Sequence, residues 1–192
     1  MSQQRKRLVV GVSGASGAPL AVALLRALKQ TPLESHLIIT HGAELTLAQE
    51  CGMTAEELGA LADAVYDNHN IGDGPASGTF PAEGMVVVPC SMKTVAGIHS
   101  GYSDTLLLRA ADVTLKERRK LVLVPRECPL STLHLRNLYE LSQTGAVILP
   151  PVLSYYHHPR SLEDVNAHIV GKILAQFGAE PEGAYHWEGL QT

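Results

Sequence analysis

The stretch GVSGASGAP, residues 11–19, combines residue types that could bind a phosphate. Gly11, Gly14 and Gly17 recur at every third position, and Ser13 and Ser16 add two hydroxyls. An apolar run precedes the stretch and a helix-like run follows it, so backbone N–H groups at the start of a helix would face a bound anion. The same residues would also suit a tight strand-to-helix connection that binds no ligand.

The spacing of this turn bears on the kind of nucleotide it could hold. The pattern is GxxGxxG, which differs from the GxGxxG of dinucleotide-binding folds. The second apolar run ends in Thr40 and His41, without the acidic residue that usually binds a ribose. Both features favour a mononucleotide over NAD.

The segment PCSMKT, residues 89–94, follows the third apolar run and offers a second helix start. Ser91 stands where an N-cap is expected, and Lys93 and Thr94 add donors in the first turn. Two helix starts of this kind favour an anion-binding edge. The alternative is that Ser91 only caps the helix and that Lys93 is a solvated charge.

Charged residues follow the fourth apolar run in PRECPLS, residues 125–131. Arg126 and Glu127 would lie at the end of a buried strand, where a charge needs a partner or a task. Upstream, Arg109 and Lys116 are seven residues apart and share one face of a predicted helix. We expect Arg109, Lys116 and Arg126 to form a basic cluster for a phosphate, with Glu127 as a neighbouring acid or base.

The fifth apolar run is followed by PPVLSYYHHP, residues 150–159. Tyr155 and Tyr156 could cover a pocket or could pack on their own helix. His157 and His158 are poor candidates for a metal site, because they are adjacent in sequence and precede a proline. Aspartate clusters such as DDxxD hold phosphate groups through magnesium, and the sequence contains no such cluster. A phosphate held by arginine and lysine without a metal fits the residues that are present.

Short apolar runs alternate with amphipathic runs along the chain. Strands are expected at 8–11, 36–40, 85–89, 121–125 and 146–149, and helices at 19–30, 43–50, 91–98, 104–118, 131–143 and 161–177. Residues 66–84 hold many turn-forming residues and are expected to be one long surface loop. The alternation predicts an α/β fold with a parallel sheet, whose ligands bind at the carboxyl ends of the strands.

Length and composition limit the classes of protein. The 192 residues fit one domain, 1–192, and 45% hydrophobic with 18% charged residues is ordinary for a globular enzyme. The net charge of −4 argues against a nucleic-acid partner. The basic start MSQQRKR leads only into a short apolar run, so we expect no signal peptide or membrane span and a cytoplasmic protein. Three cysteines without CxxC spacing fit a reducing compartment.

Five stretches of the chain, taken in order, resemble the UbiX-type flavin prenyltransferases, also known as phenylacrylic-acid decarboxylase-like proteins. They are GVSGASGAPL, PCSMKTVAGI, RAADVTLKERRKLVLVPRECPLSTLHLRNL, GAVILPP and YYHHP. The resemblance implies a flavodoxin-like Rossmann fold with three layers, bound FMN, and transfer of a dimethylallyl group from its phosphate ester to N5 and C6 of reduced flavin. It also implies a large homo-oligomer, a dodecamer, and a UbiD-type decarboxylase of an aromatic-acid or ubiquinone pathway that receives the prenylated FMN.

The resemblance also assigns roles to individual residues. FMN would be bound by Gly14, Ala15, Ser16, Thr40, Ser91, Met92, Lys93, Thr94 and Arg126. Dimethylallyl phosphate would be bound by Arg109, Lys116, Glu127, Tyr156, Lys172 and, in a C-terminal lid region, Trp187. Catalysis would involve Ser16, Glu50, Glu127 and Tyr156. Glu127 would be the acid that assists departure of phosphate and then the base that accepts the C6 proton.

Two positions depart from the family pattern. His41 follows Thr40 where members commonly have lysine, and Lys172 replaces a frequent arginine, so one phosphate contact would be a point charge. Two other functions remain open. The chain could be an FMN-dependent decarboxylase, although PASG at 75–78 is only a fragment of the PASANT-like motif of cysteinyl decarboxylases, or it could carry FMN without catalysis.

Overall fold

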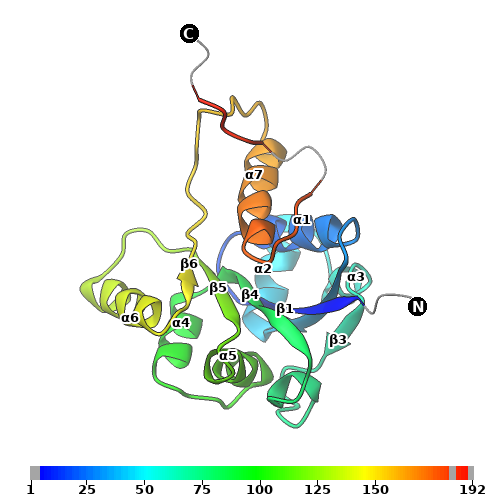
Figure 1. The fold of residues 1–192 in the computed structure, drawn as a ribbon, viewed down its shortest axis with the longest axis vertical. Helices are drawn as coiled ribbons and strands as arrows, with labels where there is room; N and C mark the ends of the chain where they lie inside the picture. Colours follow the sequence, from blue (N-terminus) through cyan, green and yellow to red (C-terminus); the bar gives the residue numbers. More distant parts are fainter. Residues whose placement is uncertain (1–4, 182–184, 190–192) are drawn as a thin grey trace.

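A parallel sheet lies between two layers of helices in the computed structural model, which describes residues 5–181 and 185–189 (Figure 1). The strands of the described residues are β1 (Lys6–Val12), β2 (Leu33–Ile39), β3 (Ala64–Tyr66), β4 (Ala82–Cys90), β5 (Lys120–Pro125) and β6 (Val147–Ile148). The helices are α1 (Ala18–Leu28), α2 (His41–Cys51), α3 (Ala55–Gly59), α4 (Met92–His99), α5 (Leu106–Lys116), α6 (Thr132–Gln143) and α7 (Leu162–Ala175), with a short 3-10 turn η1 (Gly74–Ala76).

Both faces of the sheet are buried, which explains why its central strands are continuous apolar runs. Side chains of successive strand residues point to opposite faces. Leu8 and Val10 therefore pack with α1 and α7, and Val9 packs with α4 and α5 on the other face. Two apolar cores result, one on each side of β1 and β4.

The strand order is β3-β2-β1-β4-β5-β6, and every pairing is parallel. Without the edge strand β3, the other five strands have the order second, first, third, fourth, fifth, which is the flavodoxin-like order. The predicted α/β fold class is confirmed. The chain reverses its direction of travel across the sheet between β1 and β4, so their carboxyl ends form the crevice where ligands bind in such folds.

The five predicted strands and six predicted helices are all present, and the region between β2 and β4 holds the elements that the sequence did not predict. Residues 66–84 were expected to form one loop, but β3 ends inside this range, η1 lies within it, and β4 begins at Ala82. The strand β3 has three residues and pairs with β2 alone, so it carries no long apolar run. The helix α3 begins with a capping box between Thr54 and Glu57.

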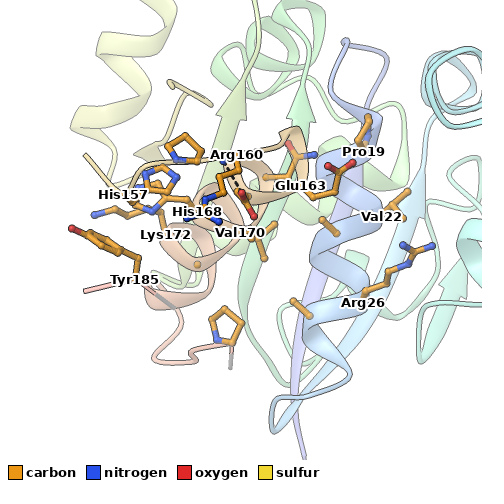
Figure 2. A pocket seen from close by; sticks show the side chains of 18 of the residues that line it. Pro19, Val22, Arg26, His157, Arg160, Glu163, His168, Val170, Lys172 and Tyr185 are labelled. Carbon is orange, nitrogen blue, oxygen red and sulfur yellow. Dashed lines mark hydrogen bonds between the residues drawn. The ribbon is translucent and has the colours of Figure 1, made fainter. Parts of the chain in front are cut away.

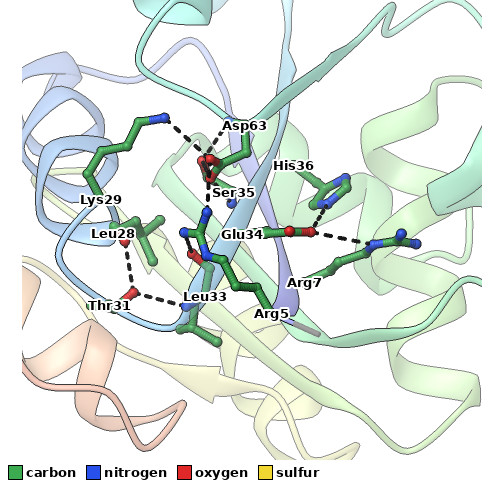
Figure 3. Close-up of polar contacts among 10 residues, drawn as sticks. All are labelled: Arg5, Arg7, Leu28, Lys29, Thr31, Leu33, Glu34, Ser35, His36 and Asp63. Carbon is green, nitrogen blue, oxygen red and sulfur yellow. Dashed lines mark hydrogen bonds and ion pairs between the residues drawn. The ribbon is translucent and has the colours of Figure 1, made fainter. Parts of the chain in front are cut away.

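Charged side chains form ion pairs with one another at the amino edge of the sheet (Figure 3). The Asp63 carboxylate accepts hydrogen bonds from the Ser35 N–H at 2.8 Å and the Ser35 hydroxyl at 2.9 Å. It also forms ion pairs with Arg5 at 3.3 Å and Lys29 at 3.4 Å. Partial burial acts to raise the pKa of Asp63, but these hydrogen bonds and charges lower it to about 2.

No helix among the described residues combines the length and the apolar character that crossing a bilayer requires.

Candidate active site

The turns that follow β1 and β4 are tied together by one buried hydroxyl. Ser13 Oγ donates to the Pro89 carbonyl oxygen at 3.0 Å and accepts the Ser91 N–H at 2.8 Å. Ser13 is fully engaged inside the protein, so it is not a hydroxyl available to a phosphate. Its position fixes the two sides of the crevice relative to each other.

Gly14 allows the backbone after β1 to touch the start of α2. A Cβ atom built on Gly14 would lie 2.8 Å from the Gly42 carbonyl carbon and 2.9 Å from the Gly42 Cα. Side chains at such distances from backbone atoms force the chain to shift. The glycine is therefore required here for a close backbone approach.

The N-terminus of α1 binds an anion that the chain itself supplies. Glu50 Oε2, at the end of α2, accepts the N–H groups of Gly17 at 2.8 Å and Ala18 at 2.9 Å. The expectation that this helix start is free for a phosphate is therefore wrong for these two N–H groups. The donors of the turn that remain exposed belong to Gly14 and Ser16.

The environment of Glu50 favours its charged form. Partial burial acts to raise its pKa, but hydrogen bonds from Gly17, the Ser16 side chain and Ala18, together with the positive charge of Arg126, lower it below the ordinary value. Arg126 thus acts on Glu50 across the crevice, and its own N–H donates to the Cys90 carbonyl oxygen at 3.1 Å. Ser16, Glu50 and Arg126 lie together at the carboxyl ends of β1, β4 and β5.

Thr40 and Ser91 each cap a helix at this edge. Thr40 Oγ1 accepts the Ala43 N–H at 3.2 Å at the start of α2. Ser91 Oγ accepts the Thr94 N–H at 3.2 Å at the start of α4 and lies 3.0 Å from Thr94 Oγ1. Lys93 is exposed, whereas Met92 and Thr94 are buried. The capping role is thus present for Ser91, and Lys93 presents an exposed charge at the same helix start.

The positions expected to bind FMN, together with Glu50, are called the flavin edge below. They are Gly14, Ala15, Ser16, Thr40, Glu50, Ser91, Met92, Lys93, Thr94 and Arg126.

Arg126 and Glu127 differ from expectation in their exposure. The strand β5 is buried through Pro125, but both charged residues that follow it are exposed in the single chain. Glu127 Oε1 accepts the Cys128 N–H at 3.1 Å. Their charges need no buried partner here, and the Glu127 carboxylate is free to meet a ligand.

The expected basic cluster of Arg109, Lys116 and Arg126 does not form within one chain. A helix that precedes a parallel strand runs back across the sheet, so Lys116 at the end of α5 lies near Lys120, where β5 begins. Arg126 follows the other end of that strand, about 20 Å from Lys120 at the usual rise per residue. Lys116 pairs with Glu117, while Arg109 donates to the Ala76 carbonyl oxygen at 3.2 Å and pairs with Asp112 at 2.6 Å.

The remaining phosphate candidates gather on a second region, which we call the α7 flank and define as residues 149–160 with α7. Tyr156, His168 and Lys172 line one cavity of about 490 Å³ there. The Tyr156 hydroxyl lies 3.0 Å from His168 Nε2, and Trp187 packs edge-on against the Tyr156 ring at 5.8 Å between centroids. His168 lines this cavity and contacts Tyr156, but the sequence analysis did not name it. Its spacing of four from Lys172 was the available signal.

A larger groove separates α7 from α1 (Figure 2). Its volume is about 910 Å³, and its lining includes Glu50 of the flavin edge and Lys172 of the α7 flank. Figure 2 shows Pro19 and Val22 of α1 on one side, with His168 and Lys172 of α7 on the other. Glu50 is thus the flavin-edge residue in the lining of this groove, and Lys172 is the phosphate candidate there, which it shares with the smaller cavity.

Comparison with known sequences gives consistent results over nearly the whole chain. Residues 1–174 match the model of the family named Flavoprotein. A probable UbiX-like flavin prenyltransferase of Sedimentibacter hydroxybenzoicus is 51% identical over 186 residues, which are 96% of this chain and 98% of that protein. The flavin prenyltransferase LpdB of Lactiplantibacillus plantarum is 50% identical over 185 residues, 96% of this chain and 99% of that protein.

Solved structures agree with the sequence relatives. A dodecameric FMN-dependent UbiX-like decarboxylase of Escherichia coli O157:H7 has a TM-score of 0.93 and 48% identity over 95% of this chain and all of that one. The UbiX protein PadA1, in complex with FMN and dimethylallyl pyrophosphate, has a TM-score of 0.95 and 45% identity over 97% of this chain and all of that one. The chain belongs to the flavoprotein family and, within it, to the UbiX-type flavin prenyltransferases.

Proposed function

We propose that the protein transfers a dimethylallyl group from dimethylallyl phosphate to reduced FMN. The observation that carries the proposal is the identity of about half of all residues, over nearly the full length, with proteins named flavin prenyltransferases. The site supports it as well, because exposed Lys93 and Arg126 follow β4 and β5 at the carboxyl edge of the sheet, and Tyr156 and Lys172 line one cavity on the α7 flank.

The donors of the flavin edge suit FMN. Ser16, Lys93 and Arg126 present exposed polar groups to the crevice, and the capping hydroxyls of Thr40 and Ser91 lie beside them. We assign FMN binding to the flavin edge as a whole. When bound, reduced FMN supplies the nucleophilic N5 and C6 that accept the prenyl group.

Phosphate binding is the task that we propose for Arg109, Lys116, Tyr156, Lys172 and the C-terminal Trp187 region. Arginine and lysine neutralise a phosphate without a metal, and a tyrosine hydroxyl adds a hydrogen bond. Because Lys116 and Glu127 lie near opposite ends of β5 in one chain, a second copy must bring Arg109 and Lys116 to the site. We therefore propose a symmetric homo-oligomer, in line with the dodecameric relative of Escherichia coli.

Glu127 is the group that we assign to proton transfer. The exposed carboxyl can give a proton to the phosphate oxygen as the bond between that oxygen and the allylic carbon breaks, so that inorganic phosphate leaves. The positive side chains stabilise the charge that develops on the phosphate, and the aromatic rings of Tyr156 and Trp187 can face an allylic cation. Glu127, once deprotonated, can then accept a proton, and Ser16 and Glu50 orient the other side of the site.

The wider setting is part of the same proposal. We propose that residues 1–192 form one domain, that a UbiD-type decarboxylase receives the prenylated flavin, and that the protein works in the cytoplasm. The last point is supported by Cys51, Cys90 and Cys128, which are all free thiols. FMN-dependent decarboxylation remains a second candidate, because the Escherichia coli structure is described as a decarboxylase.

Anaerobic incubation tests the proposal directly. Purified protein is mixed with reduced FMN and dimethylallyl phosphate, and the extracted flavin is weighed by mass spectrometry. We expect a flavin heavier by one C5H8 unit. Unmodified flavin from protein shown to bind FMN, with both the monophosphate and the diphosphate donor, would reject the transferase and favour the decarboxylase or the carrier.

A further inference from the structure

We infer that His168 is a positioning residue for Tyr156 and that it donates a hydrogen bond from Nε2 to the Tyr156 hydroxyl oxygen. This inference rests on the proposed function, in which Tyr156 binds the phosphate of the prenyl donor. His168 thus acts through Tyr156, because its hydrogen bond leaves the tyrosine proton available to a phosphate oxygen.

The contact between the two side chains is direct. The Tyr156 hydroxyl and His168 Nε2 are 3.0 Å apart, and the rings meet edge to face with centroids 5.6 Å apart. In the described part of the chain this is the hydrogen bond that the Tyr156 hydroxyl makes. Tyr156 is 44% exposed and lies in a turn of the segment that precedes α7, so the contact with α7 fixes where its hydroxyl points.

Lys172 lies one helical turn from His168 on the same face of α7. Both side chains and Tyr156 line the cavity of about 490 Å³ on the α7 flank. A hydroxyl, an imidazole and an ammonium group therefore face one volume. A phosphate bound there would meet a positive charge from Lys172 and a hydroxyl held by His168.

His157 holds the imidazole of His168 from behind. The two rings are stacked with centroids 4.3 Å apart and an angle of 14° between their planes. His157 Nδ1 lies 3.1 Å from Ser154 Oγ, which ties it to the extended segment. The stack of His157 on His168 and the hydrogen bond between Tyr156 and His168 thus join the segment to α7, and both fix the position of Tyr156.

The protonation state of His168 decides whether His168 or Tyr156 donates the hydrogen bond between them. Burial, with the charges of His157 and Lys172, lowers the pKa of His168, so the imidazole stays neutral near pH 7. A neutral imidazole has one N–H, and a tyrosine hydroxyl has one proton. A phosphate dianion offers only acceptors, so Tyr156 can donate to it only when His168 Nε2 carries the N–H. Phosphate binding therefore favours the Nε2–H tautomer.

A double-mutant cycle tests the inference. Protein loaded with oxidised FMN is titrated with dimethylallyl phosphate by calorimetry. Oxidised FMN is used so that the dimethylallyl phosphate stays intact during the titration. We expect Tyr156→Phe and His168→Phe each to raise the dissociation constant by about tenfold, since each removes a hydrogen bond that supports a charged ligand. The double variant should bind no more weakly than the weaker single variant, because both act through one group. An additive loss of about a hundredfold would overturn the inference.

A conservative replacement separates the hydrogen bond from packing. His168→Gln places an amide N–H near the position of Nε2, and we expect it to bind within about threefold of the wild-type protein. Binding as weak as that of His168→Phe would show that the hydrogen bond is not what matters and would also overturn the inference. His158→Asn is the matched control, because His158 is in the same segment and has a φ of 51° that asparagine tolerates.

The cycle also separates this inference from the proposed function. Wild-type protein that forms prenylated flavin but gives additive losses would overturn the role of His168 alone. Wild-type protein that neither binds dimethylallyl phosphate nor forms prenylated flavin would overturn both. Circular dichroism and the FMN content of each variant confirm that the protein compared is folded and loaded.

Discussion

The flavin edge and the α7 flank show two different ways of building a binding site. At the flavin edge, several polar groups bond within the chain: Thr40 and Ser91 cap helices, Glu50 accepts the first N–H groups of α1, and the neighbouring Ser13 bridges two turns. On the α7 flank, apolar side chains stand in solvent, with Val152 68% and Tyr155 75% exposed. The first region is held by hydrogen bonds within one chain, whereas the second presents an apolar surface that a further copy is expected to cover.

Glu127 follows Arg126 of the flavin edge, and its replacement is expected to have the largest effect. Glu127→Gln keeps the shape of the side chain but cannot exchange a proton at neutral pH. The rate of prenyl transfer should fall by at least about a hundredfold, while FMN affinity stays unchanged. Mass spectrometry of the flavin and FMN titration measure the two quantities. Full transfer by the variant would remove the assignment of Glu127 as the acid, and Glu83→Gln at the amino edge is the control.

Two glycine substitutions compare how closely the two regions are packed. Gly14→Ala at the flavin edge should lower the free energy of unfolding by about 2 kcal/mol, because its Cβ would meet the backbone of Gly42. Gly171→Ala in α7 should raise it by up to about 1 kcal/mol, because nothing lies within 4 Å of the added Cβ and alanine favours helix. Urea unfolding measures both. Equal effects at the two positions would contradict the difference in packing drawn here.

The amino edge provides a reference outside both regions. The pKa of Asp63 is lowered from 3.8 to about 2 in the folded protein, so its stabilisation is complete above pH 3.8 and is lost as the pH falls through 2. The shift corresponds to about 2 kcal/mol at neutral pH. The difference in unfolding free energy between wild-type protein and Asp63→Asn should therefore shrink as the pH is lowered from 5 to 3.

A constant difference over that range would show that Asp63 contributes by packing and not by its charge. Asp104→Asn serves as the control, because Asp104 is exposed and forms no ion pair within the described residues.

The sequence predicted the flavin edge better than the α7 flank, and the reason is physical. Strands buried on both faces are continuous apolar runs, and the residues after them must meet at one edge. Contacts between elements that are far apart in the sequence leave no such pattern in the order of residues. Periodicity placed Arg109 and Lys116 on one helix face but gave no direction for that helix, so the cluster with Arg126 was wrong within one chain. The contact of Glu50 with α1 and the stacking of His157 on His168 depend on tertiary packing alone.

The direction of α5 has a consequence for how ligand and assembly affect each other. Under the proposed function, a phosphate that touches both Lys116 and Glu127 is held by two chains at once, because the two residues lie near opposite ends of β5. Any ligand that binds only the assembled form stabilises it by mass action. Dimethylallyl phosphate would then shift the dissociation of the oligomer to lower protein concentrations, and dilution of the protein would in turn weaken its binding.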